Sequence, residues 1–206
     1  MPLRIPTDLS VRFERFGISL GRLSAAELEL VREHRNDPAV AQFMIFRDEI
    51  TPEQQTAWFA RVDNRNNLYG TLYWQGELVG LTNLRDIDYD TCTAEGGMII
   101  WSQHHQNSLL PFRAALVGTD LAFWEYGFER ITCRVLASNR RAIRFNRGLG
   151  YRFDDPPDAG DVVFGWLSAE NYWATTKQLR ALLDQQDGTV NGGWPLPPVR
   201  SPFDGS

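Results

Sequence analysis

The sequence predicts an α/β fold in which one mixed sheet is covered by helices. Three features of the 206-residue chain support this prediction. Helical patterns that begin with capping residues come first, strand-like segments joined by a turn follow, and helical and strand-like segments then alternate. A meander followed by strand–helix–strand crossovers places the strands in a single sheet with helices packed against it.

The first elements are recognised by their end signals. A strand is expected at Ile18–Leu20. Ser24 suits the N-cap of a helix, because Glu27 follows three residues later and can bond back to the Ser24 amide. This helix should end near Asp37, because Pro38 disfavours helical backbone at the residue before it.

A second helix should begin after Thr51. Thr51 suits the N-cap, Pro52 the first helical position, and Gln54 the reciprocal position of a capping box. Its apolar face consists of Trp58, Phe59 and Val62.

The apolar pattern then changes to that of strands. Leu68–Gln75 and Glu77–Leu84 indicate a hairpin that turns at Gly76. Glu95–Trp101 is a further expected strand. Together these segments predict a meander of three strands.

Helices and strands alternate in the second half of the chain. Leu109–Tyr126 has apolar residues at helical spacing, and Arg130–Ala137 is rich in strand-forming residues. Asn139–Leu149 is an expected helix that stops at Gly150, a residue suited to the position after a helix end. Asp161–Leu167 is the last expected strand.

The chain is expected to divide into one domain, residues 1–186, and a tail, residues 187–206. The domain closes with a helix at Ala169–Leu183. The tail is rich in glycine and proline and should be extended. Deleting it should barely change the melting temperature, unless Trp194 and Phe203 dock elsewhere.

Composition and charge exclude several function classes. The net charge of −5 argues against nucleic acid as the main partner, since duplex binding needs a basic face. No apolar run of about eighteen residues is present, so no membrane span is expected. The two cysteines form no CxxC pair, which favours a cytoplasmic chain with reduced thiols. With three histidines in the whole sequence, no metal site is expected.

A family pattern lies in the second half of the chain. A helix that ends in Ala-Phe leads to a strand containing Arg-Ile, and then to a helix that opens with Asn and closes with Leu-Gly-Tyr. The residues that carry it are Ala122, Phe123, Gly127, Phe128, Glu129, Arg130, Ile131, Val135, Asn139, Ala142, Leu149, Gly150 and Tyr151. From Ser10 to Leu183 the chain resembles GNAT superfamily N-acyltransferases, in particular ribosomal-protein alanine N-acetyltransferases and bacterial amino-sugar N-acyltransferases.

The resemblance implies a mostly antiparallel sheet with helices on both faces and a V-shaped splay between its fourth and fifth strands. Acetyl-CoA or another acyl-CoA would lie in that gap as co-substrate. Backbone amides would polarise the thioester, and a helix N-terminus would bind the pyrophosphate. The implied cofactor-binding residues are Ile99, Ile100, Trp101, Gln106, Asn107, Ser108, Leu109, Asn139, Phe145 and Arg147.

Two departures from the family pattern concern the cofactor. No glycine occurs between Trp101 and Val117, where the family has a glycine-containing phosphate loop. Gln106–Leu109 is nevertheless expected to hold the pyrophosphate, because amides at a helix start have no helical partner. Phe145 occupies the place of a tyrosine that protonates the departing thiolate. A thiolate can leave without such help, and Asn146, a bound water and Tyr151 are the candidates to replace the tyrosine.

The catalytic base is expected to be Glu95, although an exposed strand carboxylate explains it nearly as well. His104 and His105 are alternatives, because an ordinary histidine pKa of about 6.5 suits a base. The acidic stretch of Asp86, Asp88 and Asp90 could hold a cationic amine or be a solvated loop. The Arg-rich helix suggests either a solvated face or a contact with the 3′-phosphate of coenzyme A. Its arginines are Arg140, Arg141, Arg144 and Arg147.

The predicted function is therefore an acyl-CoA-dependent N-acyltransferase. The acceptor would be a primary amine on a small molecule, such as an amino-sugar nucleotide, or a protein N-terminus. Two alternatives stay open: a non-catalytic sensor or scaffold with a degenerate cofactor loop, and a transferase of longer acyl chains, suggested by the aromatic content of 12%. A homodimer is also left open.

Overall fold

The computed structural model describes residues 2–6, 12–154 and 161–186. Within these ranges the strands form one eight-stranded sheet in the order β1-β2-β3-β4-β5-β6-β8-β7. Neighbouring strands are antiparallel except β5 and β6, which are parallel. The strands are Phe13–Arg15 (β1), Ile18–Arg22 (β2), Leu68–Trp74 (β3), Glu77–Asp88 (β4), Thr93–Ile100 (β5), Arg130–Leu136 (β6), Arg152–Phe153 (β7) and Val162–Ser168 (β8). The predicted mixed, mostly antiparallel sheet is confirmed.

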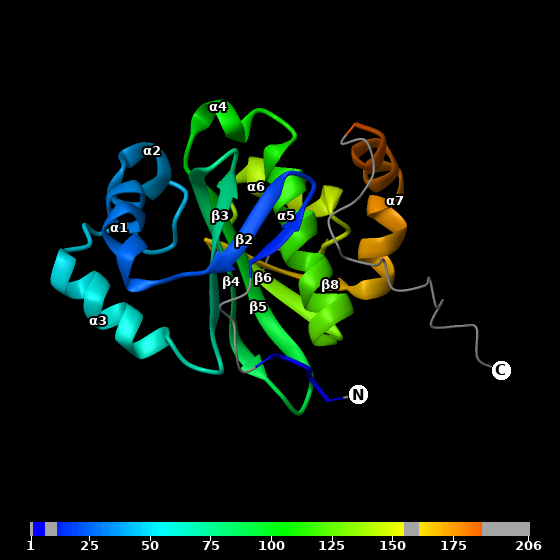
Figure 1. The fold of residues 1–206 in the computed structure, drawn as a ribbon, viewed down its shortest axis with the longest axis horizontal. Coiled ribbons are helices and arrows are strands. Elements are labelled where there is room, and N and C mark those ends of the chain that lie inside the picture. The colour runs from blue at the N-terminus through cyan, green and yellow to red at the C-terminus, as the bar shows by residue number, and fades with distance from the viewer. Residues whose placement is uncertain (1, 7–11, 155–160, 187–206) are drawn as a thin grey trace.

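Helices cover both faces of this sheet, as the sequence predicted (Figure 1). In Figure 1, α1, α2 and α3 lie on one side of the central strands, and α5 and α7 lie on the other. The helices are Ala25–Glu27 (η1, a 3₁₀ turn), Leu28–Asn36 (α1), Pro38–Ala41 (α2), Pro52–Val62 (α3), Gln103–Gln106 (α4), Leu110–Asp120 (α5), Leu121–Tyr126 (η2, a π-helical segment), Arg140–Gly148 (α6) and Ala169–Gln186 (α7). None of those described is both long and apolar enough to cross a membrane.

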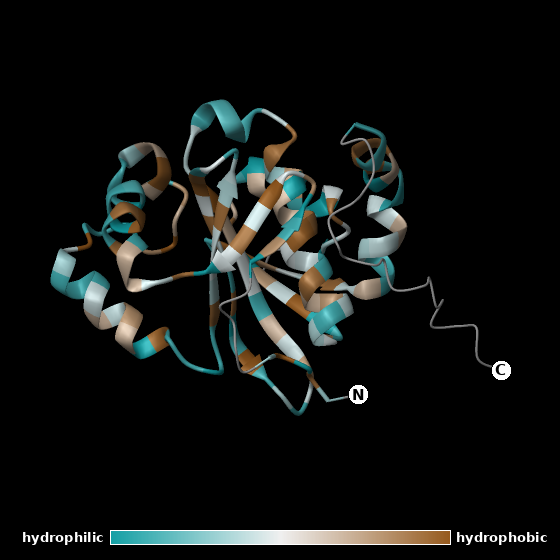
Figure 2. Ribbon diagram, in the orientation of Figure 1, coloured by the Kyte–Doolittle hydropathy of each residue, from teal (hydrophilic) through white to brown (hydrophobic). Residues whose placement is uncertain are grey.

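The core is divided by the sheet into separate apolar clusters. The largest joins β2–β5 to α5 and α7 and includes Leu116 and Leu167, both fully buried. A second lies under α1 and α3 around Val31 and Trp101. A third packs α6 against β6 and β8 through Ile143. The short helix α4 is hydrophilic throughout and belongs to none of them (Figure 2).

The predicted helix starts are confirmed by their hydrogen bonds. The Ser24 amide donates to the Glu27 carboxylate over 2.8 Å. At α3, the Gln54 amide donates to Thr51 Oγ1, and the Thr51 amide donates to the Gln54 side chain. Gly76 turns the β3–β4 hairpin with φ +83°. These signals act within a few residues, so they form wherever the chain can fold locally.

Four short elements were not predicted: β1, α2, α4 and β7. In addition, the predicted helix Leu109–Tyr126 is an α-helix to Asp120 and a π-helical segment beyond it. The tail, residues 187–206, lies outside the described residues.

A buried ion-pair network joins three distant elements. Asp120, at the end of α5, is 2% exposed. Its carboxylate accepts hydrogen bonds from Arg180 of α7, Arg15 of β1 and the hydroxyl of Tyr172. A buried carboxylate needs such partners, because desolvation without them is costly.

The strands β5 and β6 pair only at their beginnings. Their register covers Thr93↔Arg130, Ala94↔Ile131 and Glu95↔Thr132. β5 continues to Ile100 and β6 to Leu136 without further pairing between them. The predicted V-shaped splay is therefore confirmed, and Glu95 marks the base of this fork.

Candidate functional site

A cleft of about 970 Å³ occupies the fork between β5 and β6. One wall is the free part of β5, from Gly96 to Ile100, and the opposite wall is β6 with α6. From there the cleft extends past α1, α3 and the segment 43–50. The cleft thus has a cofactor half beside α6 and a second half beside α1 and α3, which we call the acceptor half.

One face of α6 lines the cofactor half. Asn139 caps the helix, because its side chain accepts a hydrogen bond from the Ala142 amide over 3.0 Å. Ala142, Phe145, Asn146 and Leu149 follow at helical spacing, and all of them line the cleft. Of the predicted residues, Asn139, Phe145 and Asn146 are therefore brought together here.

Two of these side chains have further contacts. The Phe145 ring packs on Phe112 of α5, with ring centroids 4.7 Å apart. Asn146 Nδ2 lies 3.8 Å from Cys133 Sγ, to which it donates. Burial raises the pKa of the Cys133 thiol to about 12, so this thiol is not a nucleophile near neutral pH.

The end of β5 is only partly open to the cleft. Ile99 and Ile100 line it, whereas Trp101 does not. The Trp101 amide donates to the Val79 carbonyl, and its indole stacks on His34 at 4.4 Å. Trp101 is therefore a core residue, and its amide is already paired.

The loop before α5 differs from the expected phosphate cradle. Asn107, Ser108 and Leu109 do not line the cleft, whereas Gln106 and Pro111 do. Ser108 Oγ accepts a hydrogen bond from the amide of Leu110. Since Pro111 has no amide hydrogen, few of the first amides of α5 are free.

Arg141 of α6 joins this loop to the opposite wall. Its guanidinium donates to the Gln106 side chain over 3.1 Å and to the Gln106 carbonyl. Gln106 in turn donates to the Ile100 carbonyl over 2.6 Å. Arg141 lines the cleft, whereas Arg140, Arg144 and Arg147 do not. The Arg147 guanidinium lies instead over the Phe153 ring.

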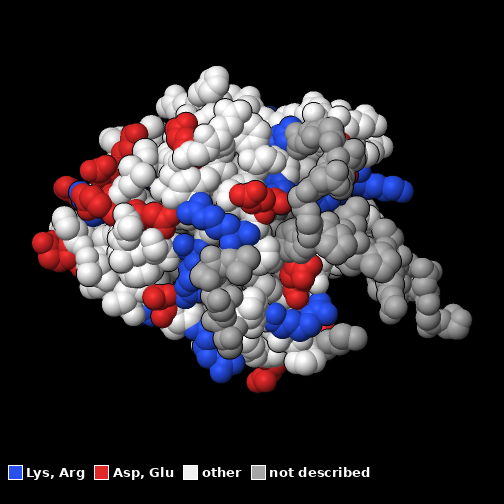
Figure 3. Space-filling view, in the orientation of Figure 1, with Lys and Arg blue, Asp and Glu red and all other residues white. Residues whose placement is uncertain are grey.

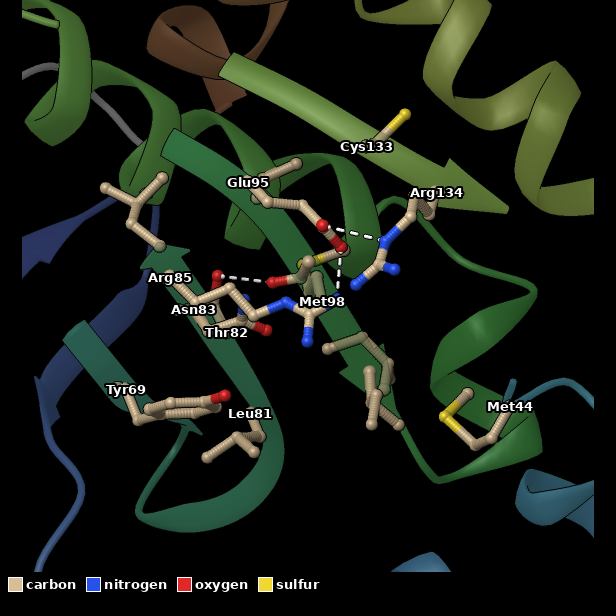
Figure 4. A pocket seen from close by; sticks show the side chains of 18 of the residues that line it. Met44, Tyr69, Leu81, Thr82, Asn83, Arg85, Glu95, Met98, Cys133 and Arg134 are labelled. Atoms are coloured by element: carbon tan, nitrogen blue, oxygen red, sulfur yellow. Dashed lines mark hydrogen bonds and ion pairs between the residues drawn. The ribbon is translucent and has the colours of Figure 1, made fainter. Parts of the chain in front are cut away.

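Glu95 lies at the base of the fork between two arginines (Figure 4). Arg134 Nε donates to Glu95 Oε2 over 2.8 Å, and Arg85 donates to Oε1. The Glu95 side chain is 16% exposed. Each oxygen therefore accepts one hydrogen bond and keeps a second lone pair that can accept a proton from an amine.

The Tyr151 hydroxyl points to the same place. Its oxygen lies 3.5 Å from the position that a β-carbon would take at Gly96, the first unpaired residue of β5. Burial raises the pKa of Tyr151 far above its usual value, so the phenol stays protonated.

The other polar candidates lie outside the cleft. Neither His104 nor His105 lines it, and nor do Asp86, Asp88 and Asp90. The Asp88 carboxylate accepts hydrogen bonds from the amides of Asp90 and Thr91, as in an ordinary turn. Among the described residues, no group of three or more His, Cys, Asp and Glu could hold a metal ion.

Sequence reasoning missed the arginines and polar residues that line the acceptor half. They are Arg22, Arg35, Arg61, Arg85 and Arg134, with Gln55 and Tyr69. They come from six separate elements, β2, α1, α3, β3, β4 and β6, so no local spacing connects them and no motif in the sequence could have found them.

Comparisons with known proteins agree with this geometry. Residues 18–152 match the family model described as acetyltransferase (GNAT) domain. Among solved structures, a GCN5-related N-acetyltransferase from Brucella melitensis has a TM-score of 0.71 at 17% identity, covering 89% of each chain. No curated protein matches the chain by sequence.

Two further structures share the fold. Spermidine N-acetyltransferase from Vibrio cholerae, in complex with CoA and spermine, has a TM-score of 0.67 at 17% identity, with 77% of this chain and 99% of that one covered. Apo FdhC, a nucleotide-linked sugar GNAT, has a TM-score of 0.70 at 16% identity, with 84% and 99% covered.

Proposed function

The chain belongs to the acetyltransferase (GNAT) domain family, and from this premise we propose that its cleft binds acyl-CoA and transfers the acyl group to a primary amine. Acetyl-CoA is the first candidate donor. The acceptor is a small-molecule amine or a peptide N-terminus. The observation that carries the proposal is the fork: β5 leaves β6 at Glu95, and a cleft fills the space between them.

The free edge of β5 would bind the pantetheine arm. Beyond Glu95, β5 has no strand partner on the β6 side among the described residues. Backbone groups of Gly96–Ile100 on this edge can pair with the amides of an extended arm, as a neighbouring strand would. An amide hydrogen aimed at the thioester oxygen would stabilise the charge that develops there during attack. Asn139, Phe145 and Asn146 would contact the arm from α6.

The phosphates would lie at the outer end of the cofactor half. Gln106 and Arg141 line the cleft there, beside the start of α5. A guanidinium is a strong partner for phosphate oxygens, and it would compensate for the missing glycines. The predicted contacts by Asn107, Ser108 and Leu109 would then need the loop to rearrange.

The chemistry needs a neutral amine and a protonated leaving group. Glu95 is the proposed base, accepting the proton on a lone pair that neither Arg85 nor Arg134 uses. The amine nitrogen then bonds to the acyl carbon, and the carbon–sulfur bond breaks. Tyr151 would give a proton to the departing sulfur, while the Asn146 amide would stabilise it by donating a hydrogen bond.

Two of the fold neighbours suggest different acceptors. One is a spermidine N-acetyltransferase and the other a nucleotide-linked sugar GNAT. Their acceptors differ in charge, so the likeness of fold does not choose between them.

The test combines binding with turnover. Wild-type protein should bind CoA in a calorimetric titration and release free thiol from acetyl-CoA when a suitable amine is present. Arg141→Glu should weaken CoA binding by about ten-fold or more, because a charge contact becomes a repulsion. Arg144→Glu is the matched control, since Arg144 lies on the same helix outside the cleft.

Three outcomes separate the alternatives. Absence of CoA binding by the wild type would overturn the proposal. CoA binding without thiol release on any amine would favour a sensor. Faster release from hydroxybutyryl- or longer acyl-CoA than from acetyl-CoA would identify a transferase of larger acyl groups.

A further inference from the structure

The cleft is strongly basic, although the protein is acidic. Among the described residues that line it, the charged side chains are one carboxylate, Glu95, and six arginines. These arginines are Arg22, Arg35, Arg61, Arg85, Arg134 and Arg141. The acidic side chains gather elsewhere, for example on the outer side of α1 and α3 (Figure 3). The cleft therefore favours anions in a chain whose net charge is −5.

Most of these arginines have partners within the protein. Arg85 and Arg134 share Glu95, Arg22 pairs with Asp63, and Arg141 bonds to Gln106. Arg35, on α1, differs from them. Arg35 lines the cleft, and its Nε atom is buried and has no hydrogen-bond partner in the described chain.

The surroundings of Arg35 contain no carboxylate that pairs with it in the described structure. The Tyr69 phenol interacts electrostatically with Arg35, and burial lowers the pKa of Arg35. A buried N–H donor without an acceptor is costly, because it has lost its hydration. Such a group is retained where a ligand can supply the missing acceptor.

Gln55, on the neighbouring helix α3, also has a buried side-chain donor without a hydrogen-bond partner in the described part of the chain. Its side chain is 3% exposed and lines the cleft. Its Nε2 atom is buried and also lacks a partner in the described residues. Two residues that each carry an unsatisfied buried donor thus line one cleft from adjacent helices. The Tyr69 ring packs edge-to-face with the Trp58 ring, with ring centroids 4.9 Å apart, and lines the same region.

We propose that the acceptor half binds an oxyanion, a phosphate or carboxylate carried by the amine substrate, through Arg35 and Gln55. This inference rests on the proposed function and specifies its substrate: the acceptor is an anionic amine. A planar guanidinium and an amide donor suit either oxyanion. A polyamine would instead bring positive charge toward arginines and would be repelled.

The test measures binding, so it does not depend on turnover. Protein saturated with CoA is titrated with two matched pairs of amines, so that the pyrophosphate region is already filled. The pairs are glucosamine 6-phosphate with glucosamine, and alanyl-alanine with its C-terminal amide. The first pair isolates a phosphate and the second a carboxylate. Spermidine is the cationic probe.

The member that carries the phosphate or carboxylate should, in at least one pair, bind about ten-fold or more tightly than the member that lacks it. Arg35→Met, which keeps the aliphatic stem, should remove this preference. Arg144→Met should keep it, because it removes the same charge outside the cleft. Arg35→Lys should retain part of it. Equal binding within both pairs, preferred binding of spermidine, or an unchanged preference in Arg35→Met would overturn the inference.

A stability measurement excludes a merely structural role. Arg35→Met should melt at or above the wild-type temperature, since it removes an unsatisfied buried donor. A markedly lower melting temperature would show that Arg35 supports the fold and would contradict the inference. If anions bind through Arg35 but no amine is acylated, the anion site stands and the proposed function fails. If spermidine is acylated and the protein shows no preference for anions, the proposed function stands and the anion site fails.

Discussion

At the scale of single residues, Tyr151 is the proposed proton donor to the leaving group. Its hydroxyl lies over Gly96 at the fork, and burial keeps it protonated because it raises the phenol pKa. Tyr151→Phe should lower kcat by about a hundred-fold, in the range of general acid catalysis, with little change in the KM for acetyl-CoA. Tyr73→Phe is the control, since the Tyr73 hydroxyl donates to Glu27 and does not line the cleft. An unchanged kcat in Tyr151→Phe would show that Asn146 or water, and not Tyr151, assists the departing thiolate.

At the scale of elements, Asp120 holds α5, α7 and β1 together. Its buried carboxylate accepts from Arg180 over 2.8 Å and from Arg15 over 3.0 Å. Asp120→Ala should lower the free energy of unfolding by about 3–5 kcal/mol, because it leaves buried guanidinium charge unpaired. Glu29→Ala removes an exposed partner of Arg32 and should leave the urea midpoint unchanged. Equal midpoints for the two variants would show that the buried network does not stabilise this packing.

At the scale of the whole molecule, several buried phenols and a thiol predict sensitivity to alkali. Burial raises the pKa of Tyr126 and of Cys133 to about 12, and it also raises those of Tyr151 and Tyr172. The unfolded chain ionises first, near pH 9 for the thiol and pH 10 for the phenols. Stability should therefore be complete below about pH 9 and fall toward pH 12, each group contributing up to about 1.4 kcal/mol per pH unit. Urea midpoints from pH 8 to 11 test this, and Tyr126→Phe should reduce the loss above pH 10. Constant midpoints to pH 11 would contradict it.

Much of the fold could be predicted from local patterns in the sequence. Ser24 with Glu27, Thr51 with Gln54, and Gly76 specify helix starts and a turn through atoms only a few residues apart. The fork followed from the family pattern between Ala122 and Tyr151, and the pairing of β5 with β6 confirms it. The face of α6 at Asn139, Phe145 and Asn146 was likewise predictable, because helical spacing places these residues together.

The remaining features depend on contacts between distant parts of the chain. β1 and β7 are too short for a sequence pattern and exist because β2 and β8 pair with them. Trp101 is a core residue because His34 and Val79, far away in the sequence, occupy its ring and its amide. The sequence could nominate Glu95 as a base, but its two arginine partners come from separate strands. Arg35 and Gln55 likewise line the cleft from different helices. A side chain's hydrogen bonds and burial depend on neighbours that only folding brings together. The positive charge of the cleft, which comes from arginines on separate elements, therefore depends on the tertiary structure.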